Sequence, residues 1–173
     1  MATNVYGFIG LGNMGAAMCS NLVKSGINII CYDIAGTAER APRGAGIAGS
    51  ILDVALASEF IFLSLPDGSI VTEVTKDIVK AKSRKCHTII DLSTTGPETA
   101  SKVGNDLSKE NIIFIDAPVS GGKSGAVAAT LALMCSGPDD SIEGLTEVFN
   151  VIAGNVIQVG QEPGQAQAMK LLN

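Results

Sequence analysis

One run near the N-terminus decides the fold of this chain: Val5-Tyr6-Gly7-Phe8-Ile9-Gly10-Leu11-Gly12-Asn13-Met14-Gly15. Residues 5–9 form a short apolar run that ends at a glycine, as expected of a buried strand. Residues 13–24 carry apolar side chains at helical spacing, and residues 27–32 form a second apolar run. This order predicts a strand, a tight turn, a helix and a second strand, which together make a βαβ unit with a right-handed crossover.

The turn of this unit carries glycines at the spacing G-x-G-x-x-G. In dinucleotide-binding turns the first glycine permits the tight bend, the second lets a pyrophosphate approach the backbone, and the third lets helix and strand pack closely. The free N–H groups of the helix N-terminus then face the phosphates. Glycines that only shape a turn are the alternative, in a chain that has 20 of them. The flanking strand and helix favour a dinucleotide site, with these predicted cofactor-binding residues: Gly10, Leu11, Gly12, Asn13, Met14 and Gly15.

An acidic residue, Asp33, follows the second strand of the unit. A carboxylate at this position can accept hydrogen bonds from the ribose hydroxyls of an adenosine, and it repels a 2′-phosphate. The sequence therefore favours NAD over NADP as the cofactor. Arg40 and Arg43 follow within a turn or two and could accept a phosphate, so NADP is the less favoured alternative.

Strands and helices alternate along the rest of the chain. Apolar patterns predict strands over residues 60–65, 88–92, 112–116, 130–135 and 156–159, with helices over 69–81, 97–108 and 139–151. Gly26 is expected to close the first helix, and Pro97 suits the first turn of a later one. The alternation predicts an α/β fold of the Rossmann type, with a doubly wound and mostly parallel sheet.

Ligands of such sheets bind outside the carboxyl ends of the strands, so the loops at those ends are expected to carry the chemistry. In this chain these loops are residues 10–15, the segment from 33 onward, and residues 65–68, 93–96 and 117–125.

The last of these loops, Ala117-Pro118-Val119-Ser120-Gly121-Gly122-Lys123-Ser124, is one residue away from a Walker A phosphate loop. Nucleotide hydrolysis is disfavoured, because Pro118 removes a backbone N–H from the cradle and the first βα turn already carries a dinucleotide motif. The alternative is a small anion site for a substrate carboxylate, built from hydroxyl and backbone N–H donors of Ser120, Gly121 and Gly122.

Composition and charge restrict the class of protein. The chain has 173 residues, 46% hydrophobic and 17% charged, which suits one domain with a sheet covered on both faces. A net charge of −5 leaves no basic footprint for nucleic acid. No run reaches the ~18 apolar residues of a membrane helix, and the start lacks a signal-peptide pattern. We therefore expect a cytoplasmic protein that binds neither nucleic acid nor membrane.

The cysteines and the histidine suggest no metal or redox chemistry. Cys19, Cys31, Cys86 and Cys135 lie far apart among apolar residues, so buried, reduced thiols are expected. His87 has no second histidine to join it in a metal site or a triad. We predict no metal site.

Four separated blocks resemble the β-hydroxyacid dehydrogenases, the family that includes 3-hydroxyisobutyrate dehydrogenase and tartronate semialdehyde reductase. The blocks are Gly7-Phe8-Ile9-Gly10-Leu11-Gly12-Asn13-Met14-Gly15, Asp91-Leu92-Ser93-Thr94-Thr95-Gly96-Pro97, Asp116-Ala117-Pro118-Val119-Ser120-Gly121-Gly122 and Gly164-Gln165-Ala166-Gln167-Ala168-Met169-Lys170-Leu171-Leu172-Asn173. The resemblance runs from end to end and implies the N-terminal NAD-binding domain of an oxidoreductase. Such an enzyme transfers a hydride between a nicotinamide cofactor and a small, 3-hydroxyisobutyrate-like β-hydroxy acid.

The resemblance also implies roles for individual residues. They are Leu65, Pro66 and Thr94 for the nicotinamide half of the cofactor, Ser120, Gly121 and Gly122 for the substrate carboxylate, and Lys170 for catalysis. A lysine desolvated beside a cofactor can have its pKa lowered toward neutrality and can exchange the proton of a substrate hydroxyl. Spacing alone favours a solvated lysine at a helix end, and the family motif reverses that preference.

Three departures from the family pattern affect what is expected of this chain. The family continues into an all-helical domain that supplies dimer contacts and closes the active site, so we divide the chain into a Rossmann domain over residues 1–163 and the start of an interdomain helix over 164–173. The asparagine that the family places after the position of Asn173, and a later lysine, are missing, so this chain alone is expected to be inactive. Ala129 stands where the family usually has glycine.

Two other functions stay open. One is a non-catalytic scaffold that keeps a dehydrogenase-like domain, although such relatives have lost the lysine that Lys170 retains. The other is a 6-phosphogluconate dehydrogenase, which shares the fold and the lysine but whose lysine block normally differs from Lys170-Leu171-Leu172-Asn173. The parent protein is expected to form a homo-oligomer through the helical domain.

Overall fold

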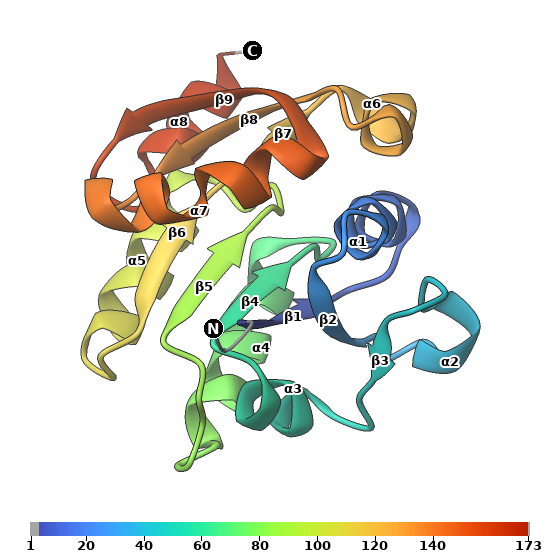
Figure 1. Cartoon of the computed structure of the whole chain (residues 1–173). Helices are drawn as coiled ribbons and strands as arrows, with labels where there is room; N and C mark the ends of the chain where they lie inside the picture. The colour runs from blue at the N-terminus through green and yellow to red at the C-terminus, as the bar shows by residue number, and fades with distance from the viewer. Residues whose placement is uncertain (1–3, 173) are drawn as a thin grey trace.

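The computed structural model describes residues 4–172, in which strands and helices alternate (Figure 1). The strands are β1 (Val5–Ile9), β2 (Asn28–Tyr32), β3 (Gly46–Ile47), β4 (Phe60–Leu63), β5 (Thr88–Asp91), β6 (Ile113–Asp116), β7 (Val119–Ser120), β8 (Leu131–Ser136) and β9 (Ala153–Gly160). The helices are α1 (Asn13–Lys24), α2 (Thr37–Arg40), α3 (Ile51–Ala57), α4 (Gly68–Lys80), α5 (Pro97–Ser108), α6 (Gly122–Ala128), α7 (Asp139–Ile152) and α8 (Gln165–Leu171).

The first six strands form the parallel sheet that the sequence predicts. They lie in the order β3-β2-β1-β4-β5-β6, and each pairs with its neighbours in parallel. The chain leaves β1 toward β2 on one side and later returns as β4 on the other, which is the switch point of a Rossmann fold. β8 then pairs antiparallel with β6 and β7, and β9 pairs parallel with β8. The prediction of a mostly parallel, doubly wound sheet is therefore confirmed.

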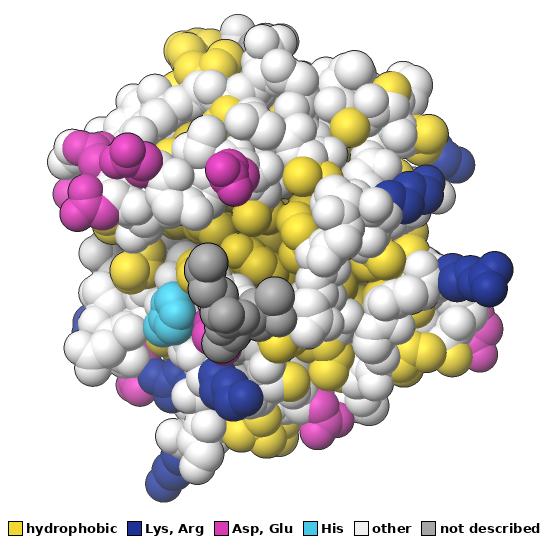
Figure 2. Space-filling model, in the orientation of Figure 1, with side chains coloured by type: hydrophobic (Ala, Val, Ile, Leu, Met, Phe, Trp, Pro, Cys, Tyr) yellow, Lys and Arg dark blue, Asp and Glu magenta, His cyan; other side chains and the backbone are white. Residues whose placement is uncertain are grey.

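Two separate hydrophobic clusters show which helices cover each face of the sheet. Helices α1, α6 and α7 pack on one face, where Phe8, Phe62 and Phe149 are fully buried. Helices α3, α4 and α5 pack on the other, around Ile61 and Ile89. In the orientation of Figure 1, Figure 2 shows acidic side chains over α7 and hydrophobic side chains between α7 and α1.

The helix ends follow the predicted signals. α1 closes at Gly26, whose φ is +88° and whose N–H donates to Val23 O at 3.0 Å, while Ile27 N donates to Leu22 O at 3.2 Å. This pair of bonds is the Schellman motif, in which glycine accepts a left-handed conformation at no steric cost. Pro97 opens α5, as predicted.

Two segments predicted without regular structure were interpreted wrongly. The stretch after Asp33 contains α2, β3 and α3, and the loop predicted over residues 117–125 contains β7 and the start of α6. These elements have seven residues or fewer, so tertiary contacts decide them rather than propensity. The bond from Asn21 Nδ2 to Ala126 O, 2.8 Å long, ties α6 to α1.

The expectation for the cysteines is confirmed, since Cys19, Cys31, Cys86 and Cys135 are all free and buried. His87 is exposed, packs its ring against Phe60 with centroids 4.8 Å apart, and lies 2.9 Å from the hydroxyl of Thr88. Within residues 4–172, no helix is both long and apolar enough to cross a membrane.

Candidate functional site

A groove of about 660 Å³ lies at the carboxyl ends of the central parallel strands. Loops far apart in the sequence form its walls. It is lined by nine of the ten predicted cofactor residues, which are Gly10, Gly12, Asn13, Met14, Gly15, Asp33, Leu65, Pro66 and Thr94. The volume falls in the range of small-molecule sites, and the position is the one at which open α/β sheets bind ligands.

The glycines of the turn differ in what surrounds them. At Gly10, where φ is +96°, a β-carbon would collide with the carbonyl oxygen of Ser64. At Gly15 it would collide with the carbonyl oxygen of Gly10, so this glycine lets α1 approach β1 closely. At Gly12 a β-carbon would meet no atom within 4 Å, because that position faces open space in the groove. The turn therefore offers a cradle into which a phosphate can approach the backbone.

Asp33 lies on the groove and holds the turn in place. Its Oδ2 accepts a hydrogen bond from Leu11 N at 2.6 Å, and its Oδ1 accepts one from Ala35 N at 2.8 Å. Arg40 Nε lies 3.9 Å from Asp33 Oδ1. A carboxylate has about four lone-pair positions, so Asp33 keeps acceptor capacity for ribose hydroxyls after bonding these two amides.

The predicted nicotinamide end of the groove is built from two linked loops. Leu65 N donates to Ser93 Oγ at 2.9 Å, which joins the loop after β4 to the loop after β5. Leu65, Pro66, Ser93 and Thr94 all line the groove, and Thr94 is exposed to it. The sequence pattern gave Ser93 no role, because only the folded chain shows which loops touch.

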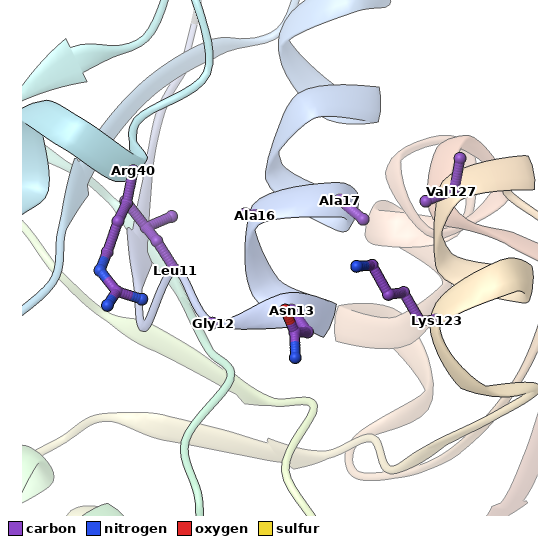
Figure 3. A pocket seen from close by; sticks show the side chains of 8 residues that line it. All are labelled: Leu11, Gly12, Asn13, Ala16, Ala17, Arg40, Lys123 and Val127. Atoms are coloured by element: carbon purple, nitrogen blue, oxygen red, sulfur yellow. The ribbon is translucent and has the colours of Figure 1, made fainter.

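A second, smaller cleft of about 400 Å³ lies beside the same turn, between α1 and α6 (Figure 3). Leu11, the tenth predicted cofactor residue, contributes to it, although its side chain is only 2% exposed. Arg40 and Lys123 lie on opposite sides of the Gly12 and Asn13 backbone, and the Lys123 side chain extends toward α1. Both cations thus flank the place where the sequence predicts phosphates.

The predicted substrate and catalytic residues lie outside the groove lining. Ser120 ends β7, Gly121 caps the start of α6 with φ of +129°, and Gly122 begins that helix with φ of +63°. Their neighbour Val119 does line the groove. Lys170 is half-buried in the last turn of α8. Asn173, the last residue of the fourth family block, lies outside the described residues.

The first turn of α8 is held by two buried side chains from the sheet. Asp116 Oδ2 accepts from Gly164 N at 3.0 Å and from Gln167 N at 3.1 Å. Ser136 Oγ accepts from Ala166 N at 3.1 Å and lies 3.3 Å from Asp116 Oδ2, to which it donates. These bonds satisfy N–H groups that a helix leaves unpaired at its start, and a carboxylate there interacts favourably with the helix dipole.

The side chain of Gln167 extends this anchor to the groove. Its Nε2 donates to Asp116 Oδ1 at 2.8 Å and to Ser93 O at 3.0 Å. Its Oε1 accepts from Thr95 N at 2.9 Å and from Gly96 N at 3.1 Å. The four bonds use both N–H groups and both lone pairs of an amide that is 1% exposed.

Asp91 and Asp116 are two carboxyl groups buried at the ends of adjacent strands, where they are register partners. Burial raises the pKa of Asp91 to about 7, and Asp91 Oδ2 has no hydrogen-bond partner in the described part of the chain. Burial also raises the pKa of Asp116, against the hydrogen bonds from Gln167 and Gly164 that favour its charged form. The sequence signal that could have identified this pair is an aspartate that ends each of two neighbouring apolar runs.

Comparisons with known proteins agree with this geometry. The family described as the NAD binding domain of 6-phosphogluconate dehydrogenase matches residues 5–160. Over 171 residues the chain is 35% identical to 2-(hydroxymethyl)glutarate dehydrogenase of Eubacterium barkeri, covering 96% of this chain and 56% of that protein. It is 35% identical to the mitochondrial 3-hydroxyisobutyrate dehydrogenase of Homo sapiens, with coverage of 96% and 51%.

Solved structures give the same result. 3-Hydroxyisobutyrate dehydrogenase of Mycobacterium tuberculosis, solved with L-serine, superposes with a TM-score of 0.90 at 32% identity and covers 99% of this chain and 59% of that one. Psf3 in complex with NADP+ superposes with a TM-score of 0.85 at 30% identity, with coverage of 97% and 61%. The chain spans about half the length of the curated relatives it matches. It belongs to the family described as the NAD binding domain of 6-phosphogluconate dehydrogenase.

Proposed function

We propose that this domain prefers NAD to NADP and serves an oxidoreductase that acts on a small β-hydroxy acid of the 3-hydroxyisobutyrate type. The observation that carries the proposal is the groove, where nine of the ten predicted cofactor residues converge and Asp33 presents a carboxylate. The pyrophosphate is assigned to the turn over residues 10–15 and the adenosine ribose to Asp33. Leu65, Pro66 and Thr94 are assigned to the nicotinamide half.

Bound NAD supplies a hydride acceptor at its nicotinamide ring. In the oxidative direction Lys170 would take the proton of the substrate hydroxyl, and bound NAD would accept the hydride that leaves the adjacent carbon as the carbonyl forms. Ser120, Gly121 and Gly122 hold the substrate carboxylate through hydroxyl and N–H donors. In the reductive direction Lys170 returns the proton to the new alkoxide oxygen.

The cofactor preference is tested by calorimetric titration of the chain with NAD and NADP. We expect tighter binding of NAD, and a smaller difference in Asp33→Asn, because asparagine keeps an acceptor for Leu11 N but removes the charge that repels a 2′-phosphate. Asp77→Asn is the matched control, since Asp77 lines the same groove without a proposed role. Equal affinities for the two dinucleotides in the unmodified chain would refute the preference.

The activity is tested on the whole protein by following NADH formation with a panel of β-hydroxy acids. We expect turnover with at least one of them, and a fall in kcat of about 100-fold or more in Lys170→Ala with unchanged affinity for NAD. Wild-type turnover in Lys170→Ala would refute the assigned proton transfer. NAD binding without turnover on any acid would favour the scaffold alternative.

The remaining expectations from the sequence stand as further proposals. They are the division of the chain at residues 163 and 164, the inactivity of this chain alone, the cytoplasmic location and the homo-oligomer. The human relative is mitochondrial by name. Localisation of the tagged protein is therefore the measurement that tests the proposed cytoplasmic location.

A further inference from the structure

The side chain of Gln167 joins α8, the helix that also carries Lys170, to the loop at the predicted nicotinamide end of the groove. Through Nε2 it bonds the carbonyl of Ser93, and through Oε1 it bonds the backbone N–H groups of Thr95 and Gly96. Ser93 in turn accepts a bond from Leu65 N at 2.9 Å. A continuous chain of hydrogen bonds thus runs from α8 to the groove wall.

Lys170 follows Gln167 by three positions on α8. Residues three apart on a helix project from the same side, with β-carbons about 5–6 Å apart. The hydrogen bonds that fix the Gln167 side chain on the loop over residues 93–96 therefore also fix the position of the Lys170 backbone, from which its side chain extends. Within residues 4–172, the amine of Lys170 makes no hydrogen bond or ion pair, so the direction of this side chain depends on the position of α8.

The anchor of α8 fixes its rotation as well as its position. Asp116 and Ser136 hold N–H groups of the first turn from β6 and β8, and Gln167 holds the loop after β5 from a second direction. A helix of seven residues that is bonded in two directions cannot roll about its axis without breaking buried bonds. Each buried group left unpaired would lose its hydrogen bond without regaining one from water.

We propose that Gln167 is a positioning residue, which holds α8 at the angle that directs the amine of Lys170 to the hydride-transfer end of the groove. This inference rests on the proposed function of Lys170. Gln167 is buried and does not line the groove, so its effect on the reaction passes through Lys170. A shift of about 1 Å in a catalytic group can lower a rate by about 100-fold.

The test is a double-mutant cycle on the whole protein with the best hydroxy acid. Gln167→Met keeps the length of the side chain and removes its four hydrogen bonds. We expect kcat to fall by about 10- to 100-fold, the pH profile of kcat to shift, and the affinity for NAD to change by less than about threefold. Gln165→Met is the matched control, because Gln165 lies on the same helix but is exposed, and its kcat should equal that of the wild type.

Measuring the effect of Gln167→Met on kcat in the Lys170→Ala variant distinguishes a positioning role of Gln167 from a general loss of structure. If Gln167 acts through Lys170, Gln167→Met should lower kcat much less in that background than in the wild type. An equal loss in both backgrounds, or no loss in the wild type, overturns the inference while leaving the role of Lys170 intact. An unchanged kcat in Lys170→Ala alone overturns both. Should Gln167→Met not fold, as judged by its melting curve, the same cycle is run with Ser136→Ala, which removes one buried bond to α8 and the bond that Ser136 donates to Asp116.

Discussion

Gly12 and Gly15 lie in one turn, but a methyl group added to each would meet different surroundings. At Gly15 it would collide with the carbonyl oxygen of Gly10, whereas at Gly12 it would meet no atom within 4 Å. The backbone at Gly12, with φ of −67°, is also one that alanine adopts readily. The fold needs the glycine at position 15, and the proposed cofactor needs the glycine at position 12.

This difference predicts two distinct outcomes. Gly15→Ala should lower the free energy of unfolding by about 1–3 kcal/mol, the usual cost of overpacking. Gly12→Ala should melt like the wild type and bind NAD at least about 10-fold more weakly, because its methyl group occupies the space assigned to the pyrophosphate. Thermal denaturation and calorimetric titration of both variants measure the two effects. Wild-type affinity in Gly12→Ala would contradict the assignment of the turn.

For individual residues, the sequence predicts roles that depend on a local motif and misses roles that depend on contacts between distant positions. The glycine turn and Asp33 could be found because their spacing is a motif in itself. Gln167 could not, because its bonds reach Ser93 and Asp116, which are 74 and 51 positions away. Ser136, 30 positions from its bond partner Ala166, was missed for the same reason.

Among the elements, α6 ends in a strained residue. Ala129 caps it in the left-handed conformation, with φ of +57°. That conformation costs a residue with a β-carbon about 1–2 kcal/mol, and glycine avoids most of the cost. The glycine that the sequence resemblance leads us to expect at this position would therefore relieve backbone strain rather than change side-chain packing.

Ala129→Gly should accordingly raise the free energy of unfolding by about 1 kcal/mol, which moves the melting temperature up by a few degrees. The control is Ala128→Gly, one residue earlier and inside the helix, where glycine should destabilise by about 0.5–1 kcal/mol. Melting curves of the two variants against the wild type check both signs. A lower melting temperature in Ala129→Gly would show that the strain is absent.

The longer elements were predictable and the shorter ones were not. Buried parallel strands such as β4 and β5 appear in the sequence as apolar runs, and α4, α5 and α7 carry apolar side chains at helical spacing. β3 has two residues and exists because Ile30 and Cys31 of β2 offer it a partner. α6 begins at a pair of glycines and is held by α1, so its own sequence disfavours it.

For the whole molecule, the buried carboxyl of Asp91 links stability to pH. Its pKa is raised by burial to about 7 in the folded chain, against an ordinary value of 3.8. Between these values the folded state keeps a proton that the unfolded state has lost, so the free energy of unfolding falls as the pH rises. The contribution is complete below about pH 4 and is lost as the pH passes 7.

Asp91→Asn should remove this slope, because asparagine stays neutral at every pH. Urea unfolding at several values between about pH 4 and pH 8 should show wild-type stability declining relative to the variant by up to about 1 kcal/mol per pH unit. Asp106→Asn is a control that should leave the curve nearly parallel to that of the wild type over this range, since Lys102 and Lys109 lower the pKa of the exposed Asp106 to about 2 and its effect is lost mainly below about pH 4. Parallel pH curves for wild type and Asp91→Asn would contradict the prediction.

The glycines of the turn border the groove through their backbone, because they have no side chain, and this limits how such a domain can be altered. A methyl group at Gly10 or Gly15 would damage the fold, and one at Gly12 would fill the cradle, so none of these three glycines can be substituted without loss. The rim is different: Asp33 and Arg40 border the groove through their side chains, and Ile34 beside them is 91% exposed. The dinucleotide preference of such a domain would therefore be changed by substituting these neighbouring rim residues, while the glycine turn is kept as it is.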